Sequence, residues 1–182
     1  MRFPTRQRYY SGISVPLFSL RSTESAGCGD FLDLQAFGAF AKACGFDLIQ
    51  LLPVNDTGTS SSPYSSLSSI ALNPVYLRID DIPFSGDASE MLRSLKAECE
   101  LPGKGRYGEV YERKLSILKS VYKKNLKAIR GDAALDAWIE ANPWVKPYAV
   151  YALLKERNAR ASWADWEAYR NPEPGLVEGL WN

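Results

Sequence analysis

Histidine is absent from all 182 residues of this sequence. That absence excludes a serine–histidine–aspartate triad, a cysteine–histidine dyad and an HExxH zinc site, because each of them requires an imidazole. Any acid–base chemistry on this chain must therefore use carboxylates, lysine, tyrosine or cysteine.

Paired cysteines and long apolar runs are missing as well. Cys28, Cys44 and Cys99 are odd in number and lack CxxC spacing, which favours reduced thiols over disulfides or a zinc site. The best apolar run, residues 46–54, has the length of a strand and not of a membrane span. The basic N-terminus has no apolar segment behind it, so we expect no signal peptide and a cytoplasmic protein.

The chain also lacks an excess of charge of one sign. Its 22 basic and 21 acidic side chains leave a net charge of +1, which gives no general attraction to nucleic acid or to an anionic membrane. We expect neither as a partner. The hydrophobic content of 46% is ordinary for a globular domain with a real core.

The first part of the chain has the pattern of a β-α-β unit. Residues 13–17 form a short strand candidate, and Asp30 stands at the N-cap of a helix with one apolar stripe, closed by Gly45. We expect Asp33 on the exposed side of that helix. Residues 46–54 then read as a nearly continuous apolar strand, which is typical of a parallel sheet buried on both faces.

A long polar segment, residues 55–69, begins at the carboxyl end of the second strand. Parallel α/β sheets bind their ligands at this edge. A flexible serine linker is the alternative, but Tyr64 in the middle and strand-like sequence at residues 71–79 favour an ordered binding loop.

Helices dominate after residue 81. Their expected spans are residues 88–98, 109–130, 132–140, 147–157 and 162–169. The glycine pattern of residues 103–110 matches the GxGxxGxV loop of protein kinases, but the histidine-containing catalytic loop of a kinase is absent. We interpret this segment as a connection between helices.

The expected helix at residues 109–130 is amphipathic. Its basic side carries Arg113, Lys119, Lys123, Lys124, Lys127 and Arg130. Its apolar side carries Leu115, Leu118, Val121, Tyr122, Leu126 and Ile129. Such a helix can bind acidic partners, although a solvated face over a packed core is the simpler interpretation.

The tryptophans in the last third of the chain allow two interpretations. They pack in the core, or Trp163 and Trp166 line a groove in which aromatic rings stack on sugars.

Three segments in order go beyond a generic α/β pattern. They are residues 12–31, which hold Gly-Ile-Ser-Val-Pro-Leu and Gly-Cys-Gly-Asp-Phe, residues 50–57 (Gln-Leu-Leu-Pro-Val-Asn-Asp-Thr), and residues 62–74, which begin Ser-Pro-Tyr-Ser-Ser. Together they resemble the amino-terminal part of the amylomaltases, the 4-α-glucanotransferases of glycoside hydrolase family 77. The resemblance implies an incomplete TIM-type (β/α)8 barrel, formed by residues 1–81 with an active-side loop at 55–72, followed by a mainly helical insertion at 82–182.

The resemblance also implies an activity, the transfer of α-1,4-glucan segments between maltodextrins by a retaining double displacement. That chemistry needs a nucleophilic carboxylate and a carboxylic acid. No matched position supplies either, so we expect no catalytic residue on this chain, no activity from it alone, and neither a cofactor nor a metal. A non-catalytic maltodextrin-binding remnant and an interaction module using the basic helix 109–130 are the alternatives.

The resemblance assigns substrate binding to the active-side loop. The family counterpart of Tyr64 stacks under the sugar ring at the cleavage point. Ser62 and Asn73 are candidates for hydrogen bonding and for fixing the loop, and Asp56 is expected near sugar hydroxyls.

The length of the chain does not fit a complete barrel. A TIM barrel typically needs about 250 residues, so the 182 residues here are too few for the fold that the resemblance implies. We therefore expect unpaired strand edges and exposed apolar surface.

Overall fold

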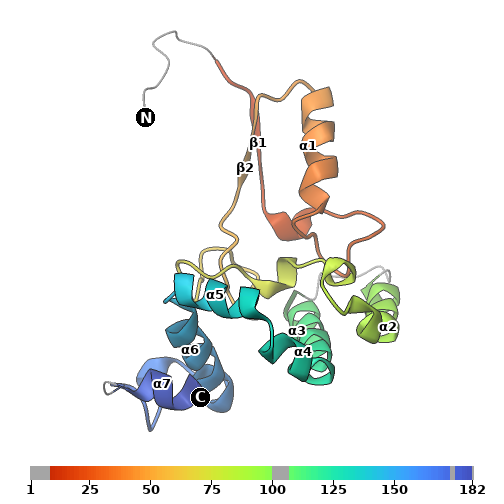
Figure 1. Cartoon of the computed structure of the whole chain (residues 1–182). Helices are drawn as coiled ribbons and strands as arrows, with labels where there is room; N and C mark the ends of the chain where they lie inside the picture. Colours follow the sequence, from red (N-terminus) through yellow and green to blue (C-terminus); the bar gives the residue numbers. More distant parts are fainter. Residues whose placement is uncertain (1–8, 100–106, 173–174, 182) are drawn as a thin grey trace. The chain divides into compact units, whose positions relative to one another are not determined.

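The computed structural model describes residues 9–99, 107–172 and 175–181 of the chain. They form two compact units that divide between Asn125 and Leu126. The first unit contains a β-α-β element, a long loop and the helices that follow it, and the second unit is helical (Figure 1). The helices just after residue 81 therefore belong to the same compact unit as the strands.

The predicted β-α-β element consists of β1 (Gly12–Val15), α1 (Asp33–Ala43) and β2 (Leu48–Leu51). The two strands pair in parallel, and α1 runs alongside them as the crossover between their ends (Figure 1). Both strands are shorter than predicted. Pro16 and Pro53 follow them closely, and proline has no backbone N–H to donate to a strand ladder.

One face of this sheet is uncovered within the described residues. Ile49 and Leu51 are half-buried, whereas Leu48 on the alternate side is 46% exposed and Phe46 is 36% exposed. The prediction that residues 46–54 are buried on both faces is therefore wrong for this chain. A single crossover helix can cover only one face of a two-stranded sheet.

Asp30 and Gly45 lie at the two ends of α1, close to their predicted positions. The Asp30 carboxylate accepts hydrogen bonds from the backbone N–H groups of Leu32 (2.9 Å) and Asp33 (3.3 Å), so it caps the turn that leads into α1, although Leu32 is the residue directly before the helix. Gly45 lies just after the helix with φ of +82°, and its N–H donates to the Lys42 carbonyl at 3.0 Å. Glycine suits this left-handed C-terminal position because it has no Cβ.

A buried ion cluster, formed by Arg78, Asp30 and Asp33, joins the start of α1 to the chain beyond the loop. Arg78 donates to both Asp30 oxygens at 2.8 Å and to Asp33 at 2.6 Å. Ser22 and Ser25 donate to Asp33 at 2.6 and 2.7 Å. Asp33 is only 4% exposed, so its predicted exposed position is wrong. Burial acts to raise the pKa of Asp33, but these hydrogen bonds and the Arg78 charge outweigh it and lower the pKa.

Short 3₁₀ turns replace the strand predicted at residues 71–79. Leu72 makes an isolated antiparallel bridge with Asn55, and the turns η2 (Pro74–Tyr76), η3 (Ile79–Asp81) and η4 (Ser85–Ala88) follow. The Asn73 side chain caps η2 by accepting the Val75 N–H at 3.0 Å. Pro74 at the first helical position favours the turn and cannot donate to a strand ladder.

The helices α2 (Ser89–Cys99) and α3 (Tyr107–Lys124) complete the first unit (Figure 1). Their apolar faces close two core clusters, whose buried members on α3 include Val110 and Ile117. Residues 100–106, with most of the kinase-like glycine pattern, lie outside the described residues. The end of that pattern, from Tyr107 onward, is helix.

The single long helix predicted at residues 109–130 is two helices. A turn at Asn125 separates α3 from α4 (Leu126–Arg130). The Asn125 side chain donates to Asp87 at 2.7 Å and to the Val121 carbonyl at 3.0 Å. The Val121 carbonyl also accepts the Asn125 backbone N–H at 3.1 Å, so the Asn125 side chain shares the last helical acceptor of α3 at the point where the helix ends.

The basic face of α3 is partly engaged within the first unit. Arg113 pairs with Glu98 at 2.8 Å, and the Lys124 ammonium donates to the Asp87 carbonyl at 2.8 Å. The buried stripe is also rotated from the predicted one, because Tyr122 is 46% exposed. The buried side chains of α3 are Tyr107, Val110, Tyr111, Lys114, Ile117 and Val121.

The second unit contains α5 (Ala133–Ala141), α6 (Val145–Arg157), η5 (Trp163–Asp165) and α7 (Leu176–Trp181). Its core is formed by Val150, Leu154 and Trp166.

The helix predicted at residues 162–169 is wrong, because the short 3₁₀ turn η5 stands there instead. Trp166 is 3% exposed and packs in the core, whereas Trp163 is 54% exposed. The core interpretation of the tryptophans therefore holds for Trp166 and fails for Trp163.

The cysteines are free thiols, and burial raises the pKa of Cys28 to about 11. Over the described ranges, no group of histidine, cysteine, aspartate or glutamate side chains is arranged to hold a metal ion. Within the same ranges, no helix combines the length and apolar character needed to cross a membrane.

Candidate functional site

The active-side loop, residues 55–72, is closed at its base by backbone hydrogen bonds. Asn55 bridges Leu72, the Asp56 N–H donates to the Ala71 carbonyl at 2.9 Å, and the Asn73 N–H donates to the Val54 carbonyl at 3.0 Å. These bonds tie the two ends of the loop together at the carboxyl end of β2. The segment is therefore an ordered loop and not a serine linker.

Tyr64 lies at the outer part of this loop. The Ser65 N–H donates to the Ser62 carbonyl at 3.1 Å, which makes residues 62–65 a β-turn with Pro63 and Tyr64 at its centre. Pro63 fixes its own φ at the second turn position and so limits the conformations of the turn. Tyr64 is 74% exposed and Ser62 is exposed beside it, so the turn presents an aromatic ring and a hydroxyl to solvent.

Asp56 is buried at the base of the loop, at 4% exposure. Its carboxylate accepts the Gly58 N–H at 2.8 Å, and its backbone carbonyl accepts the Leu67 N–H at 2.6 Å. Gly58 has a φ of +57°, a left-handed conformation in which glycine carries no Cβ penalty. Asp56 thus holds the turn into the loop and does not face solvent.

Asn73 is buried too, at 1% exposure, in a closed hydrogen-bond ring with Thr57 and Tyr107. Its amide nitrogen donates to the Tyr107 hydroxyl at 2.9 Å and to the Thr57 hydroxyl at 3.3 Å. The Thr57 and Tyr107 hydroxyls are 3.4 Å apart. Burial raises the pKa of Tyr107, so the phenol stays protonated and able to donate.

Two buried residues of α3 that support the loop were not expected from the sequence. Tyr107 enters the ring just described. Lys114 is 1% exposed and donates to the carbonyls of Val75 (2.7 Å) and Leu77 (3.1 Å), just past the loop. Burial lowers the pKa of Lys114. A signal was present, because Val110, Lys114, Ile117 and Val121 follow helical spacing, but a charged residue within an apolar stripe is normally assigned to the surface.

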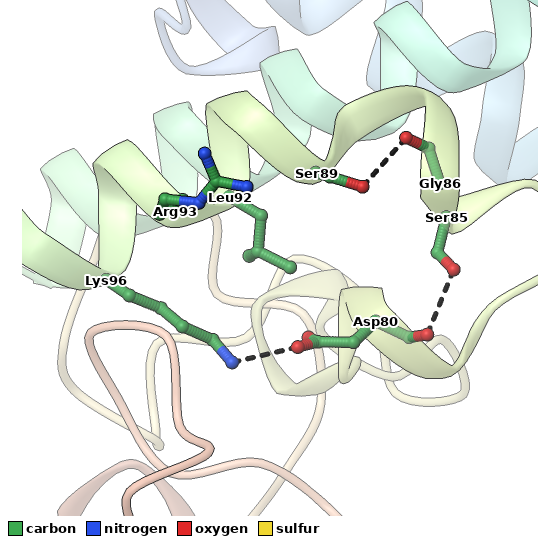
Figure 2. Close-up of a pocket in the computed structure, with 7 residues that line it drawn as sticks. All are labelled: Asp80, Ser85, Gly86, Ser89, Leu92, Arg93 and Lys96. Atoms are coloured by element: carbon green, nitrogen blue, oxygen red, sulfur yellow. Dashed lines mark hydrogen bonds and ion pairs between the residues drawn. The ribbon is translucent and has the colours of Figure 1, made fainter.

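A hollow of about 370 Å³ lies elsewhere in the first unit, between η3, η4 and the first turns of α2. Figure 2 shows the Lys96–Asp80 ion pair across it, at 2.8 Å, and the Ser85 hydroxyl bonded to the Asp80 carbonyl. None of the sequence-predicted site residues lines this hollow. The exposed turn that carries Tyr64 and Ser62 is therefore separate from this hollow.

Comparison with known proteins agrees with the family that the sequence resembles. A sequence model of the 4-alpha-glucanotransferase family, glycoside hydrolase family 77, matches residues 15–180. The 4-alpha-glucanotransferase of Chlamydia pneumoniae is 36% identical over 149 residues, which cover 79% of this chain and 28% of that protein. The 4-alpha-glucanotransferase DPE2 of Oryza sativa subsp. japonica is 35% identical over 166 residues, covering 86% of this chain and 17% of that protein.

A solved structure shares the fold. The amylomaltase from Streptococcus agalactiae in complex with acarbose superposes with a TM-score of 0.75 at 23% sequence identity, over 95% of this chain and 35% of that chain. This chain accordingly spans only about a third or less of the length of these relatives. Because the family model covers residues 15–180, nearly the whole sequence, the chain belongs to the 4-alpha-glucanotransferase family.

Proposed function

We propose that this chain forms part of the glucan-binding site of a 4-alpha-glucanotransferase, with Tyr64 as the residue that stacks against a sugar ring. The observation that carries the proposal is the 74% exposure of Tyr64 on a turn whose base is fixed by buried polar side chains. Because the loop that carries this ring is fixed at its base, little backbone entropy is lost when the apolar C–H face of glucose packs on the ring. Members of the family act on α-glucans, so such a platform fits their substrate.

The four candidate residues divide into two roles in this proposal. Tyr64 and Ser62 are exposed and would contact the sugar directly, the first by stacking and the second through its hydroxyl. Asp56 and Asn73 are buried. The Asp56 side chain bonds within the loop and the Asn73 side chain bonds to Thr57 of the loop and to Tyr107 of α3, so both would act by holding the shape of the loop.

The reaction itself would use carboxylates from other parts of the enzyme. A retaining transfer needs a nucleophile and a proton donor about 5–5.5 Å apart, and the buried Asp30 and Asp33 are already paired with Arg78. Residues 1–81 would supply the first strands of the barrel, and 82–182 the helical insertion. The uncovered face of β1 and β2 is where further barrel strands would add their side chains.

We therefore predict that the 182-residue chain alone has no transglycosylation activity on maltotriose. The measurement is chromatography of the sugars after prolonged incubation with pure protein. Unchanged maltotriose is the expected result. Release of glucose together with longer maltodextrins would show that nucleophile and acid are both present on this chain, and would refute this part of the proposal.

Binding without catalysis gives the second prediction. Maltoheptaose should bind the chain weakly, and Tyr64→Ala should raise the dissociation constant at least about tenfold, which corresponds to about 1.4 kcal/mol. The measurement is an NMR titration that follows the amide signals of residues 56–67. Tyr122→Ala, which removes an exposed tyrosine from α3, is the matched control and should leave the affinity unchanged. Equal affinities of the wild type and Tyr64→Ala would remove Tyr64 from the binding site.

A further inference from the structure

We propose that Tyr107 is a positioning residue for the loop that carries Tyr64. Its hydroxyl, at the first residue of α3, fixes the base of the loop through Asn73 and Thr57. The inference rests on the proposed function, because it assigns a purpose in glucan binding to a contact made outside the loop.

The directions of the hydrogen bonds follow from the donors available. Asn73 Oδ1 accepts the Val75 N–H, so its other terminal atom is the nitrogen that donates to Tyr107. The Thr57 hydroxyl donates its only proton to the Ser60 carbonyl at 2.7 Å. In its 3.4 Å contact with Tyr107, Thr57 Oγ1 is therefore the acceptor, which links Asn73 through Tyr107 and Thr57 to Ser60. The Tyr107 hydroxyl also hydrogen-bonds with the Tyr76 side chain.

This chain of bonds ends two residues before the turn that presents Tyr64. Ser60 is held both by the Thr57 side chain and by its own N–H, which donates to the Thr57 carbonyl at 3.2 Å. Hydrogen bonds in series polarise and strengthen one another. A buried polar group that loses its partner lowers the stability of the fold by about 1–3 kcal/mol. Loss of the Tyr107 hydroxyl should therefore loosen the loop from its base outward.

The contact can be removed without disturbing the packing of α3. The Tyr107 ring packs edge-to-face against Phe18, with centroids 5.7 Å apart, in the main core cluster. Tyr107→Phe keeps that ring and deletes only the oxygen. Gly108 adds a second close approach of α3 to the loop, because a Cβ there would lie 3.3 Å from the Thr59 carbonyl oxygen.

The test compares amide hydrogen exchange and maltoheptaose affinity in the wild type and in Tyr107→Phe. We expect the Leu67 and Asp56 amides to exchange at least about tenfold faster in the variant, while the α1 amides are unchanged. The dissociation constant for maltoheptaose should rise about fivefold. Thr57→Ser should retain wild-type values because it keeps the hydroxyl, whereas Thr57→Val should reproduce Tyr107→Phe. Tyr122→Phe, on the exposed face of α3, should change neither quantity.

Each outcome decides the proposal. Unchanged exchange at Leu67 and Asp56 overturns it, and so does faster exchange with unaltered maltoheptaose affinity. Equal acceleration of loop and α1 amides also overturns it, because Tyr107 would then support the whole unit and not the loop. If the wild type does not bind maltoheptaose at all, the proposed function fails, and the exchange comparison by itself decides whether Tyr107 positions the loop.

Discussion

Arg78→Ala should lower the free energy of unfolding of the chain by about 3–5 kcal/mol, the cost of removing one partner from a buried ion cluster. Asp30 and Asp33, at 1% and 4% exposure, would keep their charges in the protein interior without the guanidinium that now bonds to both. Hydrogen bonding by Asp30 is also the main cause that raises the pKa of Arg78, so the two charges support each other. The measurement is urea denaturation followed by circular dichroism.

The matched control is an ion pair at the surface. Arg113 and Glu98 have side chains 44% and 53% exposed, and pairs of this kind contribute about 0–1 kcal/mol. Arg113→Ala should therefore change the free energy of unfolding little. The double variant Arg78→Ala, Asp33→Asn should recover part of the stability lost by Arg78→Ala, because an amide removes one of the unpaired charges. A loss below about 1 kcal/mol for Arg78→Ala would show that water already compensates the cluster.

Gly29→Ala is expected to destabilise the chain by about 3 kcal/mol, the upper end for overpacking at a filled site. A Cβ at Gly29 would overlap the carbonyl oxygens of Leu17 and Leu20 and lie 2.9 Å from the Leu20 Cβ. The two carbonyl oxygens are backbone atoms at the start of the 3₁₀ turn Leu17–Ser19 and directly after it, and Leu17 and Leu20 are buried, so these atoms cannot easily move aside. The Gly29 N–H also donates to the Phe18 carbonyl at 3.2 Å, which fixes the two segments face to face.

Gly38→Ala provides the opposite expectation in the same thermal or urea experiment. Gly38 lies inside α1 with open space around its Cβ position, so alanine should stabilise the helix by about 0.5–1 kcal/mol. If both glycine variants shift the unfolding midpoint in the same direction, close packing is not the reason for glycine at position 29.

The local pattern of the sequence predicted the elements whose causes lie within a few residues. Asp30 and Gly45 bound α1 because caps act on the nearest backbone groups, and both positions were readable from residue type and spacing. The β-α-β order and the parallel pairing followed in the same way. Errors arose where one residue overrides a pattern, as Pro74 does in the segment predicted as a strand and Asn125 does in the helix predicted as continuous.

In the candidate loop, too, some features could be predicted from the local sequence and others could not. Its position after β2 and the aromatic residue in its turn were predicted, and Tyr64 and Ser62 lie exposed there. The burial of Asp56 and Asn73 could not be read from the sequence, since polar residues in a serine-rich segment are expected to face water. Asn73 is buried because Tyr107, 34 residues away in the chain, accepts a hydrogen bond from its amide. Asp56 is buried with its carboxylate bonded to the Gly58 N–H, two residues along the chain.

The sequence by itself therefore determined the family, the β-α-β order and the location of the loop, since motifs and short-range periodicity carry that information. Tertiary structure alone decided which polar side chains are buried and which meet solvent. Arg78 reaches Asp30 across 48 positions, and Lys114 reaches Val75 across 39. The physical reason is that a buried charge or amide is stable only beside a partner of the right geometry, and the fold chooses partners far apart in the chain. None of the hydrogen bonds described for the base of the loop needs an imidazole, because they use the Asp56 carboxylate, the Asn73 amide and the hydroxyls of Thr57 and Tyr107.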